Sequence, residues 1–100
     1  MLWIIEMKSE MGVKIYLSPT IRYAINDTAT ITVDGETVGG CLEQLVKQCP
    51  QLRRFFFDND HRFLEDFNFF VNGVFITPQD MKTPVRPGDK IHIVDIIIGG

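Results

Sequence analysis

The residues of this sequence that most suggest chemistry are the two glycines on which it ends, Gly99 and Gly100. Glycine has no Cβ, so a pair of glycines lets a backbone pass through a narrow slot and bring a terminal carboxylate close to reacting groups. At average glycine usage a chain ends on two glycines in only about 0.5% of cases. We therefore expect a carboxylate that is threaded into another protein's active site. The alternative is a flexible end or an engineered remnant.

The other residue types that do chemistry are few and scattered. Cys41 and Cys49 lie about 12 Å apart along a helix, which is too far for a disulfide, so we expect small core residues. His61 and His92 are isolated, and we expect them at the surface or partly packed. Two cysteines and two histidines do not make a four-ligand zinc or iron–sulfur site by themselves. We expect no bound metal or cofactor and no catalytic triad, and hence a carrier or co-substrate rather than an enzyme.

Length and charge exclude several classes of function. One hundred residues form one domain with a single modest core. The net charge of −3 leaves no basic face for phosphates, so we expect no nucleic-acid partner. The apolar run at residues 2–5 is too short to span a membrane and lacks the flanks of a signal peptide. We expect a cytoplasmic protein in which residues 1–12 are a flexible N-terminal extension; alternatively, Trp3 packs on the domain surface.

Alternation with a period of two predicts two strands near the start of the chain. Val13, Ile15 and Leu17 alternate with polar or amphipathic residues, and residues 29–33 repeat the pattern up to the turn at Asp34-Gly35. The polar connection between them is short, so the two strands are expected to form an antiparallel hairpin.

A helix is predicted next. Thr37 is a suitable N-cap, and Pro50 ends the helix because the residue before proline is disfavoured in helical geometry. Apolar residues at helical spacing form one stripe, which consists of Val38, Cys41, Leu42, Leu45, Val46 and Cys49.

The second half of the chain reads as an irregular segment followed by three strands. Residues 51–66 are predicted to be an irregular connection whose phenylalanines at 55–57 plug the core and whose acidic residues are solvated. Residues 67–71 alternate as a strand, and Asn72-Gly73 favours a hairpin to a short strand at 74–77. The turn at 87–89 leads into a closing strand that begins with Ile91.

This order of elements predicts an α+β fold. One helix that joins two strands of a mixed sheet by a right-handed crossover is the economical arrangement. We therefore expect a ubiquitin-like β-grasp, with a mixed sheet of four to five strands packed on one main helix. The β-grasp domain is expected to cover residues 13–98, followed by a reactive diglycine at 99–100.

At this point the sequence resembles a known family, the MoaD/ThiS group of ubiquitin-like sulfur-carrier proteins, and its longer MoaD-like members in particular. The resemblance covers residues 13–100 and lies in the order and spacing of four motifs. These are Thr37-Val38-Gly39, Phe70-Val71-Asn72-Gly73, Arg86-Pro87-Gly88-Asp89-Lys90-Ile91 and Gly99-Gly100.

The resemblance implies a function for the terminal glycines. In that family an E1-like partner uses ATP to adenylate the C-terminal carboxylate, and a sulfur donor then converts it to a thiocarboxylate. Gly100 would be the reacting residue, and Gly99 would give the tail room in the slot. A synthase subunit or enzyme would accept the sulfur, for molybdopterin, thiazole, cysteine or another thio-metabolite, and the similarity to the longer members of the family disfavours thiazole. The alternatives are a ubiquitin-like modifier joined to lysines through Gly100, and a β-grasp interaction module that does not react.

Recognition by such partners requires a surface as well as a tail. If Phe69 and Val71 face the helix, Phe70 lies on the open face of the sheet, where an exposed apolar patch would mark a docking site. The alternative is that an N-terminal or loop residue covers Phe70. The three residues Ile96, Ile97 and Ile98 are expected to dock along a partner groove as an extended segment.

Overall fold

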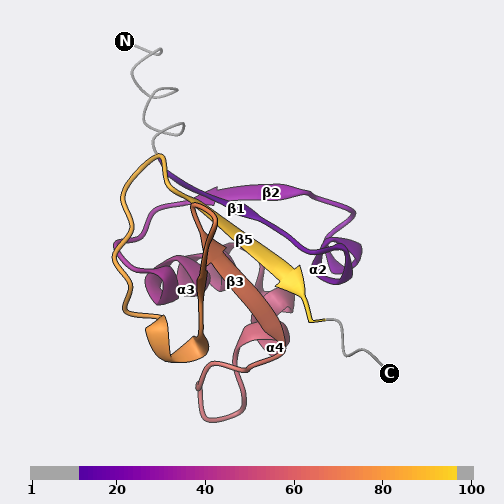
Figure 1. The fold of residues 1–100 in the computed structure, drawn as a ribbon. Helices are drawn as coiled ribbons and strands as arrows, with labels where there is room; N and C mark the ends of the chain where they lie inside the picture. The colour runs from indigo at the N-terminus through magenta and orange to yellow at the C-terminus, as the bar shows by residue number, and fades with distance from the viewer. Residues whose placement is uncertain (1–11, 97–100) are drawn as a thin grey trace.

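A mixed sheet of five strands forms the centre of the computed structural model, which describes residues 12–96 (Figure 1). The strands lie in the order β2-β1-β5-β3-β4, with β1 parallel to β5 and all other neighbours antiparallel. Their bounds are Val13–Tyr16 (β1), Thr30–Val33 (β2), Phe67–Val71 (β3), Val74–Ile76 (β4) and Lys90–Asp95 (β5). The predicted mixed sheet packed on one main helix is confirmed.

The parallel pair in the middle of the sheet brings the two ends of the domain together. Ile15 on β1 lies opposite Ile91 on β5, and both side chains are fully buried. The carbonyl of Gly12, the first described residue, accepts a hydrogen bond from the Gly88 N–H at 3.1 Å. The domain is therefore closed by pairing of its first and last strands.

The main helix, α3 (Val38–Gln48), covers one face of this sheet (Figure 1). Thr37 caps it as predicted, because its Oγ1 accepts a hydrogen bond from the Gly40 N–H at 3.0 Å. The helix approaches its neighbours closely at Gly39, where a Cβ atom would lie 3.1 Å from the Met81 carbonyl oxygen. Cys49 is its C-cap and Pro50 begins the next element, so the predicted end is confirmed.

The core lies between this helix and the inner face of the sheet. The alternation predicted for the strands holds, and the inner face carries buried Val13, Ile15, Phe69, Val71, Ile91 and Ile93. Cys41 is fully buried in the helical stripe, and burial raises the pKa of its thiol to about 11, with the charge of Asp34 adding to the effect. A thiol that stays protonated is a poor nucleophile, so Cys41 is a core residue, as expected.

A short helix that was not predicted, α2 (Pro19–Ala24), interrupts the connection between β1 and β2. Ser18 caps it through its side-chain oxygen, and Pro19 occupies the first turn, where proline suits helical geometry. The helix has six residues, too few for a periodic apolar stripe, and only Ile21 is buried. The Ser-Pro pair was the available signal.

The segment 51–66 is more ordered than predicted. The 3-10 helix η1 (Pro50–Leu52) leads into this segment, and the short helix α4 (Arg53–Phe56) follows within it. Phe56 and Phe57 are buried in the core and Phe55 is half-buried, which confirms their predicted packing role. Tertiary contacts hold these short turns, since the local sequence has no clear helical period.

Two of the motifs that carried the family resemblance meet at one end of the sheet. The Asn72 side chain donates to Asp89 Oδ1 at 3.1 Å and accepts from the Lys90 N–H at 3.0 Å. Asp89 Oδ2 also accepts from the Arg86 N–H at 2.8 Å, and these bonds, that of Arg86 first, hold the pKa of Asp89 below its ordinary value. The motif residues thus fasten the β3–β4 hairpin turn to the start of β5.

Candidate functional site

Strand β5 ends at Asp95, beside α2 (Figure 1). The Thr20 hydroxyl donates a hydrogen bond to Asp95 Oδ2 at 3.1 Å, so α2 is joined to the last residue of the strand. Ile96 follows and is 38% exposed. Ile97, Ile98, Gly99 and Gly100 lie outside the described residues, so their predicted roles stay predictions.

The open face of the sheet carries a row of four rings that crosses four strands, from β1 through β5 and β3 to β4. We call Tyr16, His92, Phe70 and Phe75 the aromatic row; the strand register sets each of them opposite the next. Tyr16 and His92 stack with ring centres 4.3 Å apart, and Phe70 meets Phe75 edge-on at 5.6 Å. Such aromatic pairs contribute stabilising free energy in addition to that of burying their surface, so the rings are held in a fixed arrangement.

Phe70 lies on the open face, as predicted, and is half-buried. The ring that packs on it is Phe75 of the neighbouring strand, which is itself 53% exposed. Val94 extends the apolar surface toward the tail and is also exposed. Lys14 adds a positive charge near the row, with its Nζ 5.7 Å from the centre of the Tyr16 ring. The surface is apolar with a basic margin, as docking surfaces often are.

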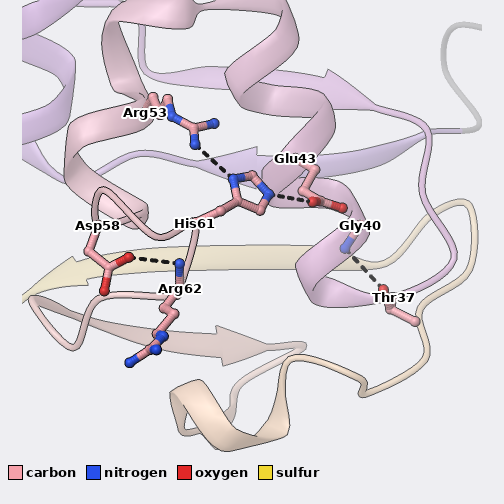
Figure 2. Close-up of polar contacts among 7 residues, drawn as sticks. All are labelled: Thr37, Gly40, Glu43, Arg53, Asp58, His61 and Arg62. Carbon is pink, nitrogen blue, oxygen red and sulfur yellow. Dashed lines mark hydrogen bonds and ion pairs between the residues drawn. The ribbon is translucent and has the colours of Figure 1, made fainter.

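A polar cluster on the other side of the molecule was not predicted (Figure 2). His61 Nδ1 lies 2.8 Å from Arg53 Nη2, and His61 Nε2 lies 3.0 Å from Glu43 Oε1 on α3. A guanidinium only donates, so Nδ1 accepts and Nε2–H donates to the carboxylate, which assigns the neutral tautomer. The ring also stacks on Phe57, with centres 4.5 Å apart.

Asp58 is a solvated loop charge, as expected, and it also organises the loop that carries this histidine. Its Oδ1 accepts hydrogen bonds from the Asp60 and Arg62 N–H groups, at 2.8 and 2.9 Å. These bonds, that of Arg62 first, lower the pKa of the Asp58 carboxyl. The sequence signal was the turn-forming run Asp58-Asn59-Asp60. The cluster fastens the loop to α3 and therefore has a structural role.

Both histidines of the described residues make contacts with neighbouring side chains. His61 bonds to Arg53 and Glu43, and His92 stacks on Tyr16. Within residues 12–96, no three His, Cys, Asp or Glu side chains gather as metal ligands. The same range has no helix of the length and hydrophobicity that a bilayer requires.

Comparison with known proteins decides the family. The model of the ThiS family matches residues 15–100, which is most of the chain and includes the final glycines. The chain belongs to the ThiS family. No curated protein matches the chain at a significant level.

Solved structures similar to this ThiS-family chain include carriers and modifiers with the ubiquitin-like β-grasp fold. Small archaeal modifier protein 1 from Methanosarcina acetivorans is 25% identical with a TM-score of 0.77, over 89% of this chain and 96% of that one. The Amycolatopsis orientalis BexX/CysO complex matches at 15% identity and a TM-score of 0.75, over 89% of this chain and 100% of that one.

A third similar structure is the complex of subunits 1 and 2 of molybdopterin-converting factor from Helicobacter pylori 26695. It matches at 17% identity and a TM-score of 0.59, over 90% of this chain and 100% of that one. The matched proteins are small chains, and two of the three structures are complexes with a partner protein. The ThiS-family chain thus has the fold of the sulfur-carrier and ubiquitin-like proteins.

Proposed function

We propose that this ThiS-family chain is a sulfur carrier whose Gly100 carboxylate is adenylated by an E1-like partner and then converted to a thiocarboxylate. The observation that supports this most is that the family match continues through Gly99 and Gly100. The chain binds no cofactor in this proposal, and the partner uses the ATP. The two cysteines of the described residues are free thiols, which suits the reducing cytoplasm in which we expect the carrier to work.

The chemistry explains why a partner enzyme is needed. A carboxylate is a poor acceptor, because an approaching nucleophile meets a negative charge and a poor leaving group. In the first step a Gly100 carboxylate oxygen bonds to the α-phosphorus of ATP and pyrophosphate leaves. Hydrosulfide released by the sulfur donor then attacks the acyl carbon, the acyl–phosphate bond breaks with AMP as the leaving group, and loss of the S–H proton leaves the thiocarboxylate on Gly100.

The described surface supplies what the partner would hold. We propose that the aromatic row, with Phe70 at its centre, docks on the partner while Ile96, Ile97 and Ile98 lie in the partner's groove. The row and the tail base are compatible with one interface, since exposed Val94 lies between His92 and Ile96 along the chain. A partner that grips both would bring Gly100 to a fixed position.

The acceptor of the sulfur is proposed to be a synthase subunit or a biosynthetic enzyme. The Helicobacter pylori and Amycolatopsis orientalis structures support this, since each is a complex of a similar small chain with a second protein. The products that we favour are molybdopterin, with this chain as the small subunit of a synthase, or cysteine.

A second candidate function is protein modification through Gly100. The Methanosarcina acetivorans structure favours it, because that protein is named a modifier and has the highest identity of the three structures described above. In this case a lysine amine of a target protein would attack the adenylated Gly100 carbonyl, AMP would leave, the amine would lose a proton, and an isopeptide bond would form.

Intact-mass measurement after co-expression with an E1-like enzyme, ATP and a sulfur source tests both functions. Exchange of one oxygen for sulfur on the peptide that ends in Gly100 is expected for the carrier. Larger lysine-linked products would instead support the modifier, and an unchanged mass in every assay would leave a non-reacting interaction module. Deletion of Gly99-Gly100 is the control, since it should abolish either product while the far-UV spectrum stays the same.

A further inference from the structure

A second surface lies on the opposite side of the sheet from the aromatic row. It is a groove of about 1140 Å³ between α2 and the segment formed by η1 and α4. The residues that give it chemical character are Tyr23 on α2 and Arg53, Arg54 and Phe55 on α4. We call it the α2–α4 groove.

The groove has an apolar floor with cations over it. Phe55 is half-buried and meets Phe67 edge-on, with centres 6.1 Å apart, so its ring is held in place. The Arg54 guanidinium lies 5.0 Å from the centre of that ring. The Arg53 guanidinium lies 5.6 Å from the Phe57 ring and is bonded to His61 (Figure 2). Aromatic rings and the histidine thus hold both guanidiniums at the surface.

Neither of these cations is neutralised by an acid within the described part of the chain. The ion pair found among residues 12–96 joins Arg22 to Asp27, whereas Glu43 accepts a hydrogen bond from the neutral His61 ring. Asp58 also lines the groove and is ionised, but its Oδ1 is bonded to N–H groups of its own loop and forms no ion pair with either guanidinium. The groove therefore carries two guanidiniums and one carboxylate, an excess of one positive charge, in a chain whose net charge is −3.

Tyr23 adds an aromatic ring that folding does not use. It is 91% exposed, on a helix whose buried side chain is Ile21. Tyrosine and arginine are the residue types that contribute most to binding at protein interfaces. An exposed tyrosine beside two available guanidiniums is therefore suited to an apolar side chain flanked by carboxylates.

The position of the groove indicates which protein would supply that ligand. Thr20 lines the groove and also bonds to Asp95 at the base of the tail. A protein that holds the residues after Ile96 therefore lies against this end of the molecule. We propose that the α2–α4 groove binds an acidic, extended segment of the protein that takes the tail. The choice of that protein rests on the proposed carrier function, whereas the chemistry of the groove does not.

A peptide titration tests the groove by itself. The probe is a capped peptide, Glu-Glu-Leu-Glu-Glu, added to the ¹⁵N-labelled full chain, with Gln-Gln-Leu-Gln-Gln as the neutral control. The acidic peptide is expected to shift the amide signals of Tyr23, Arg54 and Phe55. Added salt should weaken its binding, and Arg54→Glu should lower its apparent affinity about tenfold. Shifts confined to the aromatic row, equal binding of the neutral peptide, or no binding would overturn the proposal.

A kinetic assay tests the partner. With an E1-like enzyme that adenylates the wild-type chain, Arg54→Glu and Tyr23→Ala are expected to raise KM about tenfold at unchanged kcat. Arg86→Glu, an equal charge reversal at an exposed residue before β5, is the matched control and should leave KM unchanged. Wild-type KM in both groove variants would overturn the assignment of the partner.

The two assays test the carrier function and the groove independently of each other. If no E1-like enzyme adenylates the wild-type chain, the carrier function fails, and the peptide titration still decides the groove. Analytical ultracentrifugation of the full chain tests the remaining alternative, in which a second copy of this chain occupies the groove. A dimer that Arg54→Glu dissociates would overturn the proposal of an acidic partner segment.

Discussion

Phe69 and Phe70 are neighbours in β3, and their side chains lie on opposite faces of the sheet. The Phe69 side chain is 2% exposed and packs against Phe56 under the helices, with ring centres 6.4 Å apart. The Phe70 side chain points to the open face, where a half-exposed phenylalanine covers it. The inner face of the sheet, which we call the closed face, holds the fold together, and the open face leaves its aromatic rings partly exposed.

The largest expected effect breaks the closed face. Phe69→Ala removes a buried ring and leaves a cavity, so the free energy of unfolding should fall by about 3–5 kcal/mol. Urea denaturation followed by circular dichroism measures this fall. A loss below about 1 kcal/mol would mean that the closed face is not the main source of stability.

Phe70→Ala tests the other half of the comparison. Because the ring is half-exposed and has one aromatic neighbour in the row, its loss should cost at most about 1.5 kcal/mol of folding free energy. Affinity for the adenylating enzyme should fall about 30-fold or more, as for a residue at the centre of an interface. Calorimetric titration measures this loss.

The matched control for Phe70→Ala is Val74→Ala. Val74 is 66% exposed but pairs with Val71, whose side chain is on the closed face, so it is an exposed apolar residue outside the aromatic row. Its replacement should leave affinity unchanged. Equal losses in the two variants would contradict a specific role for the open face.

A smaller effect is expected at the cap of α3. Thr37→Ala removes the bond from the Gly40 N–H and should lower the free energy of unfolding by about 1 kcal/mol. The helix covers the closed face alone, so the amide shifts of the aromatic row should stay as in the wild type. Changes at Tyr16 or His92 in the same spectrum would show that the two faces are coupled.

The smallest expected effect concerns the stability of the fold in acid and the turn before β5, where Asp89 lies. Hydrogen bonds lower the pKa of Asp89 in the folded state, so its ionisation stabilises the fold above the unfolded value of about 3.9. This contribution is lost as the pH falls through the lower, folded-state pKa. Asp89→Asn should therefore flatten the fall in stability between about pH 5 and pH 2. Parallel wild-type and variant curves in acid denaturation would contradict this role.

The sequence predicted the closed face better than any other part. Alternation identified β1, β3 and β5, and the cap at Thr37 with the proline at 50 bounded α3 almost to the residue. Phe70 was also placed on the correct face, because the period of a strand assigns its two sides as soon as one is buried. The rest of the candidate site, Ile97 to Gly100, lies beyond the described residues.

What the sequence could not provide is the set of contacts between distant residues. Thr20 and Asp95 are 75 positions apart, and His61 lies 18 positions from Glu43. The aromatic row needs the strand order as well, since Tyr16, His92 and Phe70 meet because β5 lies between β1 and β3. The α2–α4 groove likewise appears when two short helices, which have no periodic pattern of their own, pack near each other.

The sequence by itself determined the class of fold, the inner face of the sheet and the family to which the chain belongs. These follow from local patterns, because side-chain period, caps and turn residues act over a few positions. Only the tertiary structure decided which rings gather on the open face, which helix holds the base of the tail and which cations stay unpaired. These depend on the order in which the strands pair, and that order brings together residues that the chain keeps far apart.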